Sequence, residues 1–343
     1  MANQYSITVN SQPSLYAPCP RNLDIYFSEP ETGINNDTGI LLLSSGYGGQ
    51  ANSNVFHKMR EQFADKYNYV VVQCNYFGWE YMQDIELTPD QLKGVPLGEV
   101  TDSPIPVELA LGETEAYMND MGPVQALDQL IAMKVVVDIL RDNNYHINPR
   151  RIHAYGFSHG AYINYLCNAF MPDVFTGLID NSSYLLPTYI EYGRTLEQYL
   201  DSGHTIKQVY IYLLHNIIDD YEIYKLPLLY SRFHNRAKII SFNGVLDHMT
   251  KIEDKCSFLN SIPNAVYEII TEDTVDGEIF QSAKHGLRAD FIKMFDYVMN
   301  KYDLTGNDTG LHFTERDIQT ENYIYHITMK NDIPCLQREK IIS

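Results

Sequence analysis

Residues 152–160 read IHAYGFSHG, and this stretch decides the fold. An apolar run precedes Ser158, and residues 161–163 open a helical pattern behind it. Gly156 and Gly160 lie two positions before and two positions after the serine. In a sharp turn from strand to helix the two backbones pass close to each other, so these neighbours must be small. The spacing therefore predicts a strained turn that holds the Ser158 hydroxyl clear of a sheet.

The rest of the chain alternates strand and helix patterns after an opening pair of strands. Residues 5–11 and 22–30 alternate apolar and polar side chains, which is typical of strands with one exposed face. Continuous apolar runs, typical of strands covered on both faces, then alternate with amphipathic helical patterns. The expected strands are 40–43, 69–72, 151–155, 175–180, 237–242 and 265–270, and the expected helices are 52–66, 124–140 and 288–301. This order predicts an α/β fold with a mostly parallel, doubly wound sheet and antiparallel N-terminal strands.

Two long stretches interrupt the alternation. Residues 80–120 contain ten acidic residues and one base, Lys93, which indicates a solvated loop or a functional lid. Residues 184–234 hold nine of the 27 tyrosines, and we expect a helical cap over the core there, with plain packing helices as the alternative. The predicted division is an α/β core of 1–183 and 235–302, a cap or lid of 184–234 and a C-terminal β-type extension of 303–343.

Composition and charge restrict the partners. The formal net charge is −19, so nucleic acid and anionic membrane surfaces are repelled and are not expected as main partners. No apolar stretch reaches the length of a membrane helix, and the opening MANQYSITVN lacks the features of a secretory signal. Five scattered cysteines form no CxxC pattern, which favours reduced thiols in the cytoplasm over disulfides or zinc. The C-terminal extension is expected to serve packing or a homodimer contact.

A serine hydroxyl becomes a nucleophile when a base takes its proton and an acceptor orients that base. Here the sequence resembles the α/β-hydrolase superfamily, in which serine, acid and histidine follow one another along the chain. KIISFNGVLDHMTK (238–251) looks like the family's strand and acid-bearing turn, so Asp247 matches the acid. QSAKHGLRADF (281–291) places His285 between a loop and the last helix, where the family has its catalytic histidine. The resemblance covers about residues 22–300.

Alternative residues are weighed for each role. Asp180, at the end of the strand after Ser158, is the second candidate for the acid. His159 is expected to be structural or to line the pocket, because its side chain would point away from the serine. His248 follows Asp247 directly, and sequence neighbours seldom face each other. His153 lies on a buried strand.

The loop Ser44-Ser45-Gly46-Tyr47-Gly48-Gly49 resembles the family's His-Gly-Gly-Gly oxyanion loop. It departs from that pattern because Ser45 replaces the leading histidine and Tyr47 interrupts the glycines. The resemblance implies an oxyanion hole formed by the backbone N–H groups of His159 and Tyr47, with Gly48 as the alternative to Tyr47. The glycines of this loop match neither the G-x-x-x-x-G-K-[ST] pattern nor the G-x-G-x-x-G pattern of phosphate-binding loops. Trp79 and Tyr184 are the predicted substrate contacts.

These residues predict a serine hydrolase that cleaves a carboxylic ester through an acyl-enzyme, without metal or organic cofactor. Three alternatives stay open: an acyltransferase with the same triad, a peptidase of the prolyl-oligopeptidase kind, and a non-catalytic scaffold. The layout is also similar to that of uncharacterised bacterial α/β-hydrolases encoded near flagellin or surface-glycan modification genes. That similarity implies a small acyl group on a sugar or glycan as the substrate.

Overall fold

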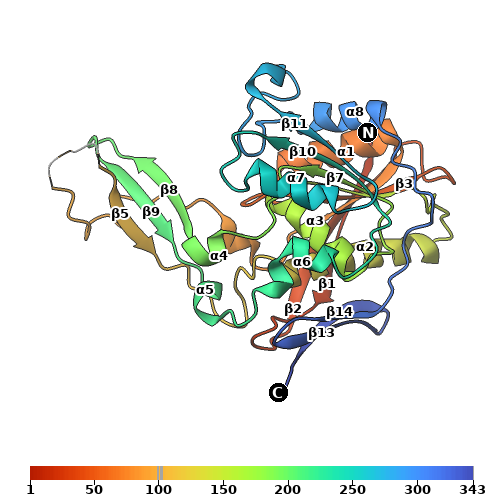
Figure 1. Ribbon diagram of the computed structural model, residues 1–343, viewed down its shortest axis with the longest axis horizontal. Coiled ribbons are helices and arrows are strands. Elements are labelled where there is room, and N and C mark those ends of the chain that lie inside the picture. Colours follow the sequence, from red (N-terminus) through yellow and green to blue (C-terminus); the bar gives the residue numbers. More distant parts are fainter. Residues whose placement is uncertain (99, 101–102, 343) are drawn as a thin grey trace.

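An eight-stranded sheet forms the centre of the molecule (Figure 1). The computed structural model describes residues 1–98, 100 and 103–342. In spatial order the strands are β1 (Asn3–Ser11), β2 (Arg21–Glu29), β4 (Tyr69–Cys74), β3 (Gly39–Ser44), β6 (Ile152–Phe157), β7 (Gly177–Asn181), β10 (Lys238–Gly244) and β11 (Ala265–Ile270). The pairs β1–β2 and β2–β4 are antiparallel, and all the other pairs are parallel. The predicted fold class is confirmed.

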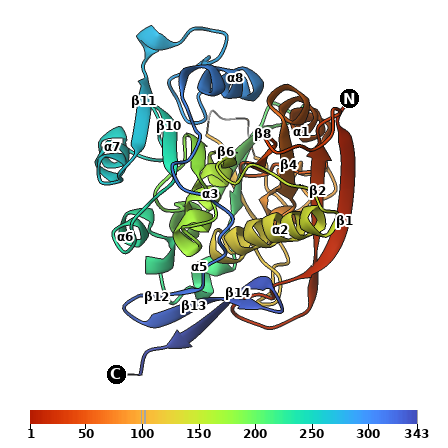
Figure 2. The ribbon, with the colours of Figure 1, turned by 90° about the vertical axis from the view of Figure 1, so that its right-hand side faces the viewer.

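Helices cover both faces of this sheet (Figure 2). The longer ones are α1 (Asn54–Tyr67), α2 (Pro123–Asp142), α3 (His159–Phe170), α7 (Ile252–Asn260) and α8 (Phe291–Lys301). Short helical turns are η1 (Trp79–Met82), α4 (Tyr189–Tyr192), α5 (Leu214–Ile217), η2 (Glu222–Tyr224), α6 (Leu226–Tyr230) and η3 (Glu272–Thr274). Among the described residues, no helix has the length and hydropathy needed to cross a bilayer.

Alternation along the strands divides the interior into two cores. On β3, Ile40 and Leu42 join one core with side chains of α2 and α3. Leu41 and Leu43 point the other way and join a second core with side chains of α1 and α8. Each central strand therefore needs apolar residues on both faces, which is why these strands appear in the sequence as continuous apolar runs.

A second sheet projects from the main body as an arm, defined here by β5 (Ile105–Leu109), β9 (Thr205–Tyr210) and β8 (Arg194–Tyr199) (Figure 1). β5 pairs with β9 in parallel, and β8 pairs with β9 in antiparallel orientation. The expectation of a helical cap at 184–234 is thus only partly right, because this segment supplies two strands besides its short helices.

The physical reason is that β8 and β9 alternate side chains and are joined by a turn through Gly203, which has a positive φ of 85°. The acidic stretch 80–120 supplies β5, so it is more than a solvated loop. Glu99, Thr101 and Asp102 of this stretch lie outside the described residues.

The C-terminal residues form a third sheet of β12 (Arg316–Gln319), β13 (Tyr323–Lys330) and β14 (Ile333–Lys340). All its pairs are antiparallel. Ile327 and Leu336 are buried in the core that contains α2, and Lys134 of α2 forms an ion pair with Asp332 at 2.5 Å. This sheet therefore packs on the outer side of α2. The predicted homodimer role stays a prediction.

His153 lies inside the sheet region with both ring nitrogens bonded. Nε2 lies 2.9 Å from the carbonyl oxygen of Leu304, which can only accept, so Nε2 carries the hydrogen. Nδ1 then accepts from the Tyr69 hydroxyl at 2.8 Å. Burial lowers the pKa of His153 to about 3, so the folded protein holds this imidazole neutral.

We predict that His153 makes the protein less stable in mild acid. The pKa of His153 in the folded protein lies below its ordinary value near 6.5. The contribution of this residue to the free energy of unfolding is therefore fully present above pH 6.5 and is lost as the pH falls toward 3. Between pH 6.5 and 5 the loss should be roughly 2 kcal/mol. Urea unfolding of wild type and His153→Gln at pH 7 and pH 5 measures this loss, since the variant has no titrating side chain at position 153. An equal pH dependence of both proteins would contradict the prediction.

Candidate active site

The turn between β6 and α3 holds Ser158 in strained geometry. Its φ of 52° and ψ of −120° lie in a region that a non-glycine residue rarely adopts. A Cβ atom on Gly156 would lie 2.5 Å from the backbone nitrogen of Ala161, and one on Gly160 would lie 2.3 Å from the carbonyl oxygen of Ser44. Both positions therefore require glycine, and the expectation that the serine's neighbours must be small is confirmed.

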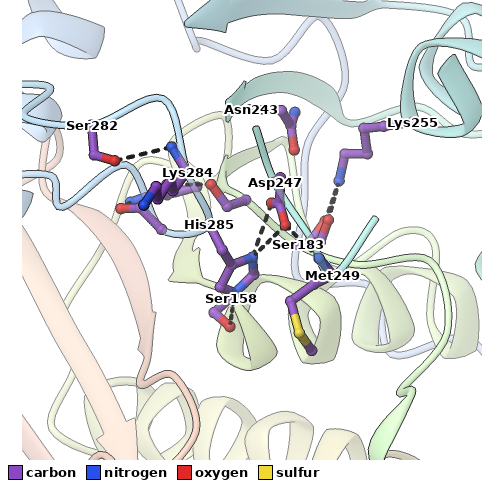
Figure 3. Close-up of polar contacts among 12 residues, drawn as sticks. Ser158, Ser183, Asn243, Asp247, Met249, Lys255, Ser282, Lys284 and His285 are labelled. Carbon is purple, nitrogen blue, oxygen red and sulfur yellow. Dashed lines mark hydrogen bonds and ion pairs between the residues drawn. The ribbon is translucent and has the colours of Figure 1, made fainter. Parts of the chain in front are cut away.

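Three predicted site residues form one hydrogen-bonded chain (Figure 3). Ser158 Oγ lies 2.7 Å from His285 Nε2, and His285 Nδ1 lies 2.9 Å and 3.0 Å from the two carboxylate oxygens of Asp247. An ionised carboxylate only accepts, so the hydrogen of the neutral ring is on Nδ1 and Nε2 accepts from the serine. The Asp247 side chain is 4% exposed and that of His285 is 18% exposed. The chain is thus ordered for proton transfer from serine to histidine.

Close backbone packing brings Asp247 and His285 together. A Cβ atom on Gly244, at the end of β10, would lie 2.0 Å from the carbonyl oxygen of Ala283, so the two loops touch here. Leu246 N–H donates to the same carbonyl at 2.9 Å. Asp247 is further held by the backbone N–H of Met249, which donates to its carboxylate at 2.8 Å. The loop after β10 and the loop that carries His285 therefore form one unit.

Asp180, the second candidate for the acid, bonds other side chains than His285. Its carboxylate forms an ion pair with Lys255 Nζ at 2.9 Å, and both side chains are 1% exposed. It also accepts hydrogen bonds from Tyr165 at 3.0 Å, from Ser241 at 2.7 Å and from both the backbone and the hydroxyl of Ser183. The carboxylate that bonds His285 belongs to Asp247, so the structure does not place Asp180 in the acid's position.

The other weighed histidines do not reach Ser158 as bases. His159 is fully buried, its Nε2 lies 2.6 Å from the side-chain oxygen of Gln125, and its Nδ1 bonds the Tyr184 hydroxyl. Burial lowers the pKa of His159 to about 3. The ring of His248 stands edge-on to that of His285, with centroids 5.9 Å apart.

The glycine-rich loop after β3 lies beside this turn. A Cβ atom on Gly46 would lie 2.7 Å from the ring of Phe157, so the loop approaches β6 closely. The Tyr47 ring packs edge-on against His159, with centroids 5.6 Å apart. The Arg194 guanidinium, from the first residue of the arm's β8, lies 5.0 Å from the centre of that ring. The part of the Tyr47 or Gly48 backbone amide in an oxyanion hole stays a prediction.

The two predicted substrate contacts differ in access. Trp79 is half-buried at the start of η1, and η1 touches the glycine-rich loop, since a Cβ atom on Gly48 would lie 3.1 Å from the Met82 carbonyl oxygen. Tyr184 is 2% exposed, and its hydroxyl is engaged by His159. Tyr184 thus supports the site from within, and contact of either residue with a substrate stays a prediction.

Sequence analysis did not find four buried polar residues near this site: Asn119 and Gln125, which bond Tyr47 and His159, and Ser183 and Lys255, which bond Asp180. Each is polar and nearly fully buried. Their sequence surroundings are ordinary helix or loop residues, and only the tertiary structure shows what they bond. A polar residue inside the apolar pattern of 124–140, such as Gln125, is the one signal that the sequence offered.

Similarity to known proteins is found for the structure of this chain and not for its sequence. No family model and no curated protein sequence matches it. An acylaminoacyl peptidase from Pyrococcus horikoshii is similar, with a TM-score of 0.53 and 12% identity over 91% of this chain and 43% of that chain. An acylaminoacyl peptidase bound to Z-Gly-Gly-Phe-chloromethyl ketone gives 0.53 and 13% over 90% and 43%. Est1E from Butyrivibrio proteoclasticus gives 0.47 and 12% over 84% and 97%. The chain thus spans less than half of the two peptidase chains.

We predict that Asp180 matters for stability. Asp180→Asn leaves the Lys255 ammonium buried without its counter-charge, and this should cost about 3–5 kcal/mol of unfolding free energy. Ser241→Ala removes one hydrogen bond to the same carboxylate and the bond that Asn243 Nδ2 donates to the Ser241 hydroxyl, and should cost about 1–2 kcal/mol. Urea unfolding at pH 7 measures both. A cost for Asp180→Asn no greater than that for Ser241→Ala would contradict the prediction.

Proposed function

Because the chain has the α/β-hydrolase fold, we propose that it is a serine hydrolase that cleaves carboxylic esters. One observation carries the proposal: the chain of hydrogen bonds from Ser158 through His285 to Asp247, with the serine held at a strained bend. A serine bonded to an imidazole that is itself oriented by a buried carboxylate is the arrangement that nucleophilic acyl transfer requires.

In the proposed first half-reaction, Ser158 Oγ forms a bond to the acyl carbon while His285 Nε2 takes the hydroxyl proton. The carbonyl oxygen becomes an oxyanion, to which the N–H groups of His159 and Tyr47, or of Gly48, would donate. The intermediate then expels the alcohol, whose oxygen receives the proton back from His285. The product of this half-reaction is an ester of Ser158.

In the second half-reaction, water attacks the acyl-enzyme while His285 takes one of its protons. Collapse of the second oxyanion releases the acid, and the proton returns from His285 to Ser158 Oγ. Asp247 keeps the ring in the tautomer with hydrogen on Nδ1 and balances the charge of the imidazolium. The 18% exposure of the His285 side chain supports hydrolysis over transfer to another alcohol, because solvent reaches the base.

We propose to test first an ester in which a small acyl group is attached to a hydroxyl of a sugar. The half-buried indole of Trp79 lies on a turn that contacts the glycine-rich loop, and an aromatic ring that reached a bound substrate from there would suit the apolar face of a sugar ring. Hydrolysis of acetylated sugars faster than of simple p-nitrophenyl esters supports this substrate class. Acetyl transfer to a sugar alcohol faster than to water would instead favour the acyltransferase.

We predict that a fluorophosphonate probe labels the wild-type protein and does not label Ser158→Ala. The probe forms a bond from phosphorus to the serine oxygen and releases fluoride, so it reports an activated hydroxyl. Labelling is read by intact-protein mass spectrometry, with folding of both proteins checked by circular dichroism. A folded wild type that resists the probe would refute the proposal.

We also predict different effects for two neighbouring histidines. His285→Gln removes the base and should lower kcat for an ester by about 10³–10⁴-fold. His248→Gln, one residue from Asp247 but outside the hydrogen-bonded chain, should change kcat less than about threefold. Steady-state kinetics on a p-nitrophenyl ester compares them. Equal losses in the two variants would remove His285 from its assigned role.

A further inference from the structure

A buried chain of neutral hydrogen bonds connects the two segments assigned to the oxyanion hole. Asn119 Nδ2 donates to the Tyr47 hydroxyl at 2.8 Å, and Asn119 Oδ1 accepts from Gln125 Nε2 at 2.9 Å. The side-chain oxygen of Gln125 lies 2.6 Å from His159 Nε2, and His159 Nδ1 bonds the hydroxyl of Tyr184. We call these five side chains the relay.

The chemistry of the partners fixes the direction of every bond in the relay. Gln125 Nε2 also lies 2.9 Å from the carbonyl oxygen of Phe77, which can only accept, so the amide nitrogen is on that side. The amide oxygen therefore faces His159, and His159 must carry its hydrogen on Nε2. Nδ1 is then bare and accepts from Tyr184. Any other tautomer would break a bond at 2.6 Å inside the core.

The relay is anchored to rigid surroundings on one side and to the site on the other. Gln125 lies in the first turn of α2, and Asn119 is fixed from outside by Glu113, whose carboxylate accepts from the Asn119 backbone N–H at 2.8 Å. Asn119, Gln125 and His159 are each 0% exposed. The low pKa of His159 keeps the ring neutral, so the relay places no full charge beside the serine.

Such a set of buried polar groups is costly to desolvate, and replacing bonded polar pairs by apolar groups of the same shape can be nearly neutral for stability. Its hydrogen bonds fix the relative positions of the groups that they join, because a hydrogen bond is restricted in length and in orientation. Here the relay includes Tyr47 and His159, whose backbone amides are the assigned donors to one oxyanion.

We propose that the relay positions the oxyanion hole by holding the Tyr47 loop and the start of α3 at a fixed separation, with Gln125 as the central positioning residue. The inference rests on the proposed hydrolase function. It assigns Asn119 and Gln125 to that function although neither is in the hydrogen-bonded chain of Ser158, His285 and Asp247.

Gln125→Met tests the inference, and Gln129→Met is a matched control. Both glutamines are 0% exposed on α2, one turn apart, but the Gln129 side-chain amide has no hydrogen-bond partner within the described part of the chain. On a p-nitrophenyl ester, Gln125→Met should lower kcat about 10–100-fold with KM changed less than about twofold. The reason is that the displaced amides bind the oxyanion of the transition state and not the bound ester. Gln129→Met should leave kcat within about twofold.

A double-mutant cycle distinguishes the relay from general destabilisation. Tyr47→Phe removes the hydroxyl at one end of the relay and should also lower kcat, about 3–10-fold. Because both changes interrupt the same chain, the double variant should be no worse than Gln125→Met alone. Multiplicative losses, or a kcat unchanged in Tyr47→Phe, would overturn the inference. Tyr47→Phe also carries the test should Gln125→Met not fold.

A second readout does not depend on catalysis. Nitrogen-15 NMR of the His159 ring should show hydrogen on Nε2 in wild type and in Gln129→Met, and a mixture of tautomers in Gln125→Met. Hydrogen on Nδ1 in wild type would overturn the relay itself. A loss of kcat in Gln125→Met no larger than in Gln129→Met overturns the positioning role while Ser158 labelling, and with it the proposed function, stands. Failure of wild type to label refutes the function independently of the tautomer.

Discussion

The contact between the start of α3 and the end of β3 determines the geometry of the site. The Cα of Gly160 is so close to the carbonyl oxygens of Ser44 and Ser45 that no side chain fits between them. This contact forces α3 to begin directly after Ser158 and beside the glycine-rich loop. It therefore sets the strained backbone of the serine and the proximity of His159 to Tyr47 together. Packing at one backbone crossing thus fixes both the Ser158 hydroxyl and its surroundings.

A second crossing does the same for the remaining residues of the site. Gly244 lets the loop after β10 touch the loop of residues 281–287, so Asp247 and His285 meet although they lie 38 positions apart in the sequence. The buried pair of Asp180 and Lys255 lies on the neighbouring strand and helix and holds β7 against α7. The site is thus built from close backbone contacts and supported by buried polar bonds, each of which tolerates few substitutions.

The serine turn, Asp247 and His285 were accessible from the sequence because each lies in a short local pattern: the first two follow a strand directly, and His285 lies in the loop before the last helix. The arm was not, because β5 pairs with a strand about a hundred residues further along the chain, as in the pair Ile105 and Ile206. Six-residue strands such as β8 also carry too little periodicity to be told from a helical turn. The partners of Gln125 and Lys255 depend on elements distant in the sequence, so no local pattern could indicate them.

The arm packs against residues 85–97 and forms a small apolar cluster with them, in which Leu87, Leu92 and Ile206 are the buried members. So little apolar surface gives the arm a lower local opening free energy than the main sheet, and its amides should exchange with solvent sooner. Arg194 belongs to this arm and yet lies over the ring of Tyr47. Opening of the arm as far as Arg194 would therefore remove a cation from the ring of Tyr47 without separating any strand of the main sheet.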